Sequence, residues 1–72
     1  MSRYNSGNYA YGYDHPLQEY FLQENKGEET VEIVGCLSRK KGTSRNLLEA
    51  IYALEIEIPE EHKTQIELDL PF

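Results

Sequence analysis

The chain has one cysteine, no tryptophan, three prolines and no long apolar run. A single thiol excludes an internal disulfide, and no Cys/His cluster suggests a structural metal. A transmembrane helix is not predicted, because that needs about 18 or more consecutive apolar residues. The segment 1–7 is polar, unlike the apolar core of a secretory signal. We therefore expect a cytoplasmic protein that does not engage a membrane.

The chain is also short, with 72 residues and a net charge of −6. One domain is the most that this length supports, and such a domain buries only about 60% of the surface of its unfolded chain. Small domains often gain further burial from a partner, so we expect a protein partner or self-association into a homodimer. The negative charge disfavours nucleic acid as a partner. No cofactor is predicted.

Charge of each sign is concentrated in its own segment. Four of the seven basic residues lie between positions 39 and 45, whereas the segment 49–69 is rich in Glu and Asp. The expected molecule therefore has a basic corner on an acidic body.

The segment 43–54 carries the clearest helix pattern. Thr43 or Ser44 is a suitable N-cap, and Gly42 allows a sharp turn into the helix. Apolar residues recur at helical intervals and predict one buried stripe, formed by Leu47, Leu48, Ile51, Tyr52 and Leu54.

A β-hairpin is predicted before this helix. The segment 17–23 fits a strand, although its spacing also fits a helix, and the polar segment 24–29 is a suitable connection. The segment 30–37 is rich in β-branched residues and is the best strand pattern, with Cys36 as an apolar filler. Gly35 is expected to mark a bulge or a close approach of the helix.

After the central helix, residues 54–58 alternate as an extended segment would. Pro59 followed by Glu60 and Glu61 predicts a short helix that reaches about Glu67. The alternation at 66–70 leaves a terminal strand as the alternative. The predicted fold class is a small single α+β domain, with a β-hairpin packed on one central helix and a short C-terminal helix.

Residues 1–13 are Tyr-, Asn- and Gly-rich and are interpreted as a flexible segment preceding a domain at 14–72. The alternative is an extended segment laid along a sheet edge or a partner. In that case Tyr9, Tyr11 and Tyr13 lie on one face, because side chains alternate along a strand.

The basic segment is the candidate anion site. A helix start offers unpaired backbone N–H groups, and hydroxyls and cations gather around it. The spacing of glycine, lysine and hydroxyl residues in this segment does not match that of a P-loop, which argues against nucleotide hydrolysis. The candidate residues are Arg39, Lys40, Lys41, Gly42, Thr43, Ser44 and Arg45.

A second candidate surface would bind a protein partner. Carboxylates in the C-terminal third are able to face a basic groove, and the N-terminal tyrosines are able to supply aromatic contacts. The candidate residues are Tyr9, Tyr11, Tyr13, Glu55, Glu57, Glu60 and Glu61.

No catalytic constellation is recognisable. His15 and His62 each have neighbouring carboxylates but lack a third group at a suitable spacing, and Cys36 lies in an apolar strand where burial suppresses reactivity. The sequence therefore favours a small acidic non-catalytic protein-interaction or regulatory protein. The alternative is a module that binds an anion or nucleic acid through residues 39–45.

Overall fold

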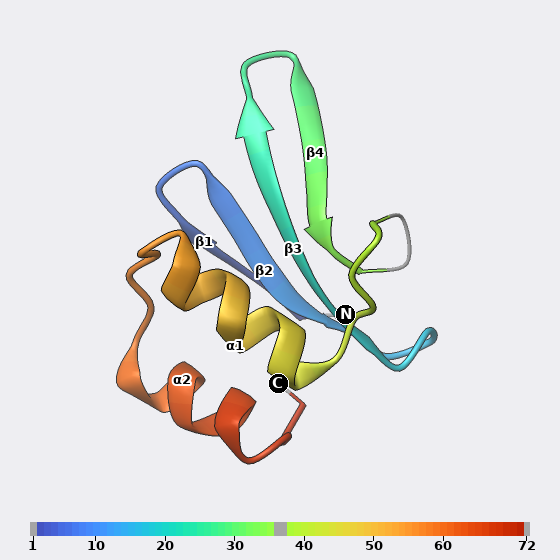
Figure 1. Cartoon of the computed structure of the whole chain (residues 1–72), viewed down its shortest axis with the longest axis vertical. Helices are drawn as coiled ribbons and strands as arrows, with labels where there is room; N and C mark the ends of the chain where they lie inside the picture. The colour runs from blue at the N-terminus through green and yellow to red at the C-terminus, as the bar shows by residue number, and fades with distance from the viewer. Residues whose placement is uncertain (1, 36–37, 72) are drawn as a thin grey trace.

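The computed structural model describes residues 2–35 and 38–71, and it shows a small α+β fold in which four strands precede two helices (Figure 1). The strands follow one another in a single antiparallel sheet of order β1-β2-β3-β4. Their bounds are Ser2–Ser6 for β1, Tyr9–Asp14 for β2, Glu19–Lys26 for β3 and Glu29–Val34 for β4.

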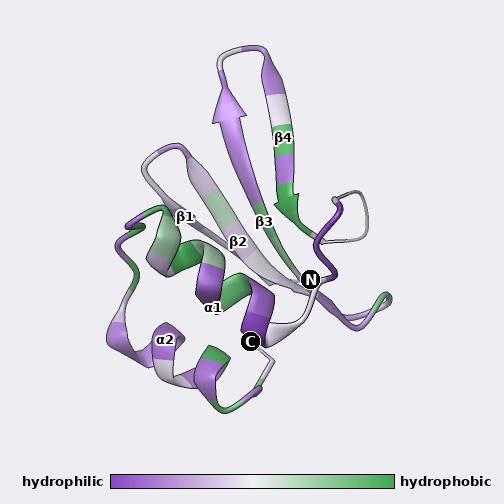
Figure 2. Ribbon diagram, viewed as in Figure 1, coloured by the Kyte–Doolittle hydropathy of each residue, from purple (hydrophilic) through white to green (hydrophobic). Residues whose placement is uncertain are grey.

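Both helices, α1 (Ser44–Ala53) and α2 (Glu60–Glu67), pack on the same face of this sheet. The tip of the β3–β4 hairpin extends beyond the helices and is hydrophilic, whereas the hydrophobic residues concentrate where α1 meets the sheet (Figures 1 and 2). The core consists of buried side chains from β2, β3, β4 and the two helices and their connection, namely Tyr11, Tyr20, Leu22, Val34, Leu47, Ala50, Ile51, Ile56 and Ile66.

The N-terminal segment differs from the prediction of a flexible 1–13 region. Residues 2–14 form the hairpin of β1 and β2, and Tyr11 is only 1% exposed in the core. The polar composition of this segment is misleading because Tyr supplies a large apolar ring in a strand that otherwise carries small residues. The boundary predicted at residue 14 therefore has no counterpart in the fold.

The turn of this hairpin explains how a Gly- and Asn-rich segment folds back. Ser6 pairs directly with Tyr9, so the loop has Gly7 and Asn8 at its centre, and Gly7 adopts a φ of 58°. Glycine with positive φ at the first central position is typical of a type II′ turn, whose twist matches that of the flanking strands.

The predicted hairpin of β3 and β4 is confirmed, with a tighter turn than expected. β3 lies further along the chain than the predicted 17–23, and β4 begins one residue earlier and ends earlier than the predicted 30–37. Gly27 supplies the positive φ of 67° at the turn. The register between the strands shifts at Leu22 and Gln23, close to the irregularity that Gly35 was expected to mark. The predicted filler Cys36 lies outside the described residues.

The central helix begins as predicted, and Thr43 is its N-cap, because the Thr43 hydroxyl accepts a hydrogen bond of 3.1 Å from the Asn46 N–H. The buried stripe is narrower than expected. Leu47, Ala50 and Ile51 are buried, whereas Tyr52 is 54% and Leu54 41% exposed. The helix contacts the sheet on one side and α2 on another, and Tyr52 and Leu54 remain exposed at its C-terminal end.

The short C-terminal helix is confirmed and the alternative of a terminal strand is wrong. Pro59 precedes the first helical residue, and Glu60 and Glu61 occupy the first turn, where carboxylates favour the positive end of the helix dipole. Between the helices, residues 56–59 pair with no strand in the described part of the chain. This connection instead contacts β1, because the Ser6 hydroxyl donates a 2.5 Å hydrogen bond to the Glu57 carbonyl oxygen.

Candidate functional site

The basic segment forms the loop that leads into α1, and its four cationic residues Arg39, Lys40, Lys41 and Arg45 are all exposed. Gly42, by contrast, is buried against the start of β3, where its carbonyl oxygen accepts a 2.8 Å hydrogen bond from the Tyr20 N–H. A Cβ atom at Gly42 would overlap that Tyr20 backbone. Glycine is needed here because two backbones pack closely against each other.

Polar groups at this helix start are already engaged within the chain. The Thr43 hydroxyl caps the helix, and the Asn46 side-chain amide donates a 3.0 Å hydrogen bond to the Lys41 carbonyl oxygen. The Arg45 guanidinium lies 3.4 Å from the Glu49 carboxylate on the same helix face. Arg39, Lys40 and Lys41 therefore project to solvent from a loop with a defined local structure, and Arg45 does so from the first turn of α1.

Two carboxylates of the chain reach the same corner. Glu19 Oε1 lies 3.4 Å from the Gly42 N–H, and Asp69 lines a hollow of about 300 Å³ together with Thr43 and Ser44. Burial, followed by the charge of Asp69, raises the pKa of Tyr20 in this hollow to about 12. Because these carboxylates already meet the positive end of α1, an incoming anion has to compete with them.

The three predicted tyrosines lie on one face, as the alternating pattern implies. That face is the one covered by the helices, where Tyr11 is in the core and Tyr9 and Tyr13 pack against it. Tyr11 is therefore a core residue that is unavailable to a partner, whereas Tyr9 and Tyr13 are only half-buried.

Tyr11 instead joins a small aromatic cluster that fixes α2 on the sheet. Its hydroxyl lies 2.6 Å from His62 Nδ1, and the His62 ring lies 4.2 Å from the ring of Tyr4. Burial is the main cause of the raised pKa of Tyr11, with a smaller contribution from Tyr4. Tyr11 and His62 are more than 50 residues apart in the sequence, so no local sequence pattern predicts their contact.

The predicted acidic residues are all exposed, and three of them gather around one groove. Glu55, Glu57 and Glu60 border a hollow of about 480 Å³ between the end of α1 and the start of α2. Its walls also contain apolar side chains and one cation, from Ile51, Tyr52, Ile56, Ile58 and Lys63. Glu61 borders a neighbouring hollow with Glu60. We call the first hollow the acidic groove.

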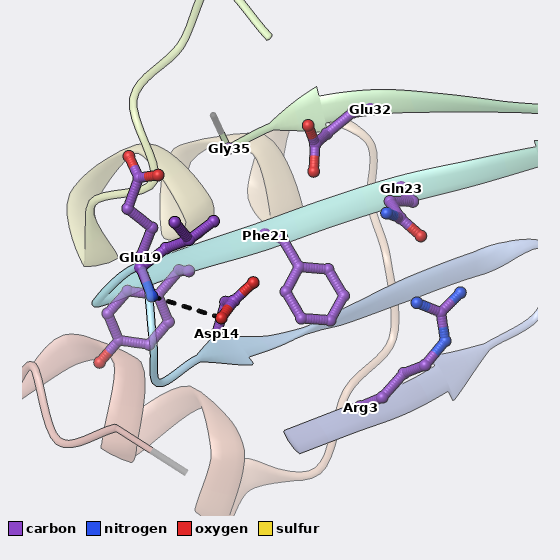
Figure 3. A pocket seen from close by; sticks show the side chains of 9 residues that line it. Arg3, Asp14, Glu19, Phe21, Gln23, Glu32 and Gly35 are labelled. Atoms are coloured by element: carbon purple, nitrogen blue, oxygen red, sulfur yellow. Dashed lines mark hydrogen bonds between the residues drawn. The ribbon is translucent and has the colours of Figure 1, made fainter. Parts of the chain in front are cut away.

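A further hollow lies on the helix-free face of the sheet and was missed by sequence reasoning (Figure 3). The Phe21 ring is its centre, only 6% exposed, and the Arg3 guanidinium lies 5.8 Å from the ring centroid. Strand alternation places Arg3 and Phe21 on one face, but only the pairing of β1 with β2 and of β2 with β3 brings them together across Gly12. Its volume is about 100 Å³, and its lining residues are Arg3, Asp14, Leu17, Glu19, Tyr20, Phe21, Gln23, Glu32 and Gly35.

Within residues 2–35 and 38–71, no three His, Cys, Asp or Glu side chains are close enough together to hold a metal ion. The centroid of the His15 ring lies 4.9 Å from that of the Tyr13 ring. His15 is distant in sequence from His62. No helix in the described part of the chain has the length and apolar character needed to cross a membrane.

Comparison with known proteins yields no match among protein-family models, curated proteins or solved structures.

Proposed function

We propose that this chain is a small non-catalytic interaction protein that binds a basic segment of a protein partner in the acidic groove. The observation that carries the proposal is the convergence of Glu55, Glu57 and Glu60 around one hollow with apolar walls. Carboxylates at the rim of an apolar surface select a cationic partner and accelerate its association, while the apolar atoms contribute affinity.

The charge arrangement around α1 supports this proposal. The last turn of α1 contains no basic residue, and Glu55, which borders the acidic groove, follows the end of the helix. This is the reverse of the arrangement that stabilises a helix dipole, where each favourable charge contributes about 0.3–1 kcal/mol. Residues that oppose local stability are expected where a surface serves binding.

The test compares two double variants with the same change in charge. E55K/E57K alters the groove, whereas E28K/E29K alters the exposed tip of the β3–β4 hairpin. Glu60 is left unchanged because a lysine in the first turn of α2 would also weaken that helix. We expect an affinity-tagged wild-type chain to retain a stoichiometric protein from a lysate of its source cells, in a salt-sensitive manner.

The groove variant E55K/E57K should release that protein and the tip variant E28K/E29K should retain it. Equal retention by both variants would contradict a role for the groove. Equal release by both would show that net charge alone attracts the partner, which also contradicts the proposal. Circular dichroism of each variant checks that the fold is intact.

The alternative function is binding of an anion or nucleic acid at residues 39–45, which the exposure of Arg39, Lys40, Lys41 and Arg45 favours. It is the weaker proposal because Glu19 and Asp69 already lie at this corner. The triple variant K40E/K41E/R45E separates the two functions. We expect it to leave the groove partner bound, whereas loss of an oligonucleotide or phosphate signal in the same variant would favour the alternative.

The proposed setting is the cytoplasm, which suits a chain with a single thiol.

A further inference from the structure

β1 forms one edge of the sheet. β1 is the outermost strand on its side and pairs with β2 alone among the described strands. An edge strand presents N–H and C=O groups that are able to pair with another chain, and natural proteins usually protect such edges. The direction of these groups follows from the turn between β1 and β2.

Ser6 and Tyr9 flank the turn and pair directly, so they form the hydrogen-bonded pair that closes a tight hairpin. Hydrogen-bonded and non-hydrogen-bonded pairs alternate along antiparallel strands. Arg3, opposite Gly12, and Asn5, opposite Ala10, are therefore non-hydrogen-bonded positions. Their backbone N–H and C=O groups point outward from the sheet.

The charge on β1 does not protect this edge. Arg3 is the one ionisable side chain of β1 with a full charge at neutral pH, and its guanidinium lies over the Phe21 ring at 5.8 Å. Phe21 belongs to β3, so the Arg3 side chain crosses β2 toward the middle of the sheet. The cation is directed inward along the sheet face rather than outward from the edge.

The opposite edge, at β4, is protected in the ways that edge strands usually are. It has an irregular register, and the Ser38 hydroxyl donates a 2.7 Å hydrogen bond to the Ile33 carbonyl oxygen. Glu29 and Glu32 add negative charge along it. The charges of β4 itself therefore disfavour a second acidic chain at that edge, whereas the strand β1 carries no carboxylate.

We propose that a second copy of this chain pairs with β1 in antiparallel fashion, so that two four-stranded sheets join into one. The strand sequence Ser-Arg-Tyr-Asn-Ser is nearly symmetric about Tyr4. A two-fold axis at Tyr4 places Arg3 opposite Asn5 of the second copy and the two Tyr4 residues opposite each other.

This register pairs the outward backbone groups of β1 and also places compatible side chains opposite each other. Arg3 and Asn5 are the residues whose N–H and C=O groups point outward, and they become hydrogen-bonded pairs across the axis. Ser2 faces Ser6 of the second copy, and no like charges are opposed. Hydroxyl pairs and aromatic pairs at directly opposed positions stabilise antiparallel strands.

The interface is a short one, since β1 has five residues. Contacts of limited area are generally weak and reversible. The dimer is therefore expected to form at high concentration and to dissociate on dilution. Sedimentation equilibrium of the full chain, from low micromolar to millimolar concentration, measures it.

Charge substitutions at Asn5 test the register, because Asn5 is exposed and its substitution leaves the core intact. N5K places a lysine opposite Arg3 on both sides of the axis and should weaken dimerisation roughly fivefold, whereas N5D should strengthen it by about the same factor. T30K makes the same charge change on β4, again at an exposed position, and should not weaken the dimer.

Amide exchange supplies an independent readout. The N–H groups of Arg3 and Asn5 should exchange more slowly as concentration rises, because they become bonded only in the dimer. The proposal is overturned if the wild-type chain is monomeric throughout the concentration range, if N5K and N5D dimerise equally, or if protection develops at β4 instead. None of these results depends on whether the acidic groove binds a partner. The dimer and the proposed function of the groove can therefore be refuted separately.

Discussion

Replacing Gly12 by alanine tests how closely β1 lies against β2. Glycine in a strand is ordinarily less stable than alanine by about 0.5–1 kcal/mol, because glycine loses more backbone freedom on folding. At Gly12 the sign should reverse. An added Cβ atom would overlap the carbonyl oxygen of Ser2 and lie 3.0 Å from Cε2 of Phe21. The first contact is with backbone, so side-chain repacking does not relieve it.

Inserting a methyl group into a well-packed site typically costs about 1–3 kcal/mol. The clash with backbone puts the cost near the upper end of that range, and the gain in backbone entropy on replacing glycine is subtracted from it. We therefore expect the free energy of unfolding of G12A to fall by about 2 kcal/mol. A domain of this length is stabilised by about 4–11 kcal/mol in total. For a small domain that loss corresponds to a fall in Tm of about 8–16 °C.

Thermal and urea unfolding followed by circular dichroism measure the effect. G27A is the matched control, because Gly27 has a φ of 67° and no atom within 4 Å of the added Cβ. It carries backbone strain of about 1–2 kcal/mol without a clash. A G12A variant that is as stable as the wild type, or more stable, would refute the close approach of β1 to β2.

Three further predictions concern α1 and the sheet beneath it. L47A should lose about 2–5 kcal/mol of stability because Leu47 is fully buried, whereas L54A, at a 41% exposed position, should lose much less; equal losses in urea unfolding would contradict the observed orientation of the helix. T43A should cost about 1 kcal/mol through loss of the N-cap bond, and S44A only a small fraction of that, so a larger effect in S44A would reassign the cap. Tyr20 has a pKa raised from 10.0 to about 12 in the folded chain, so the native state retains its proton longer than the unfolded state and stability falls as pH rises from 10 to 12. Y20F should therefore flatten the alkaline decline in a pH series of unfolding midpoints, and an unchanged slope would show that Tyr20 does not titrate in this way.

The helices illustrate what local sequence predicts well. The Thr43 cap, the apolar spacing of Leu47 and Ile51, and Pro59 before two glutamates are signals contained within a few residues, and both helices begin where these signals lie. The β3–β4 hairpin is of the same kind, because Gly27 supplies the positive φ of its turn. Each of these features depends on backbone conformation that neighbouring residues impose.

The N-terminal hairpin shows where local signals are insufficient. Its segment has few aliphatic residues, and the stability of its strands comes from the Tyr11 ring in a core completed by the later helices. The burial of Tyr11 also removes its ring from the predicted aromatic partner surface. A tyrosine alternating with small residues is compatible with both a solvated segment and a core strand, and the difference depends on what covers it.

Sequence by itself determined the α+β class, the starts of both helices and the separation of basic and acidic segments along the chain. Tertiary structure decided which charges share a surface. It brought Glu55, Glu57 and Glu60 around one groove, placed Glu19 beside Gly42, and turned Arg3 inward over Phe21. The physical reason is that caps and turns are set by interactions between neighbouring residues, whereas these contacts require the sheet register and the packing of the helices, which the whole chain establishes together.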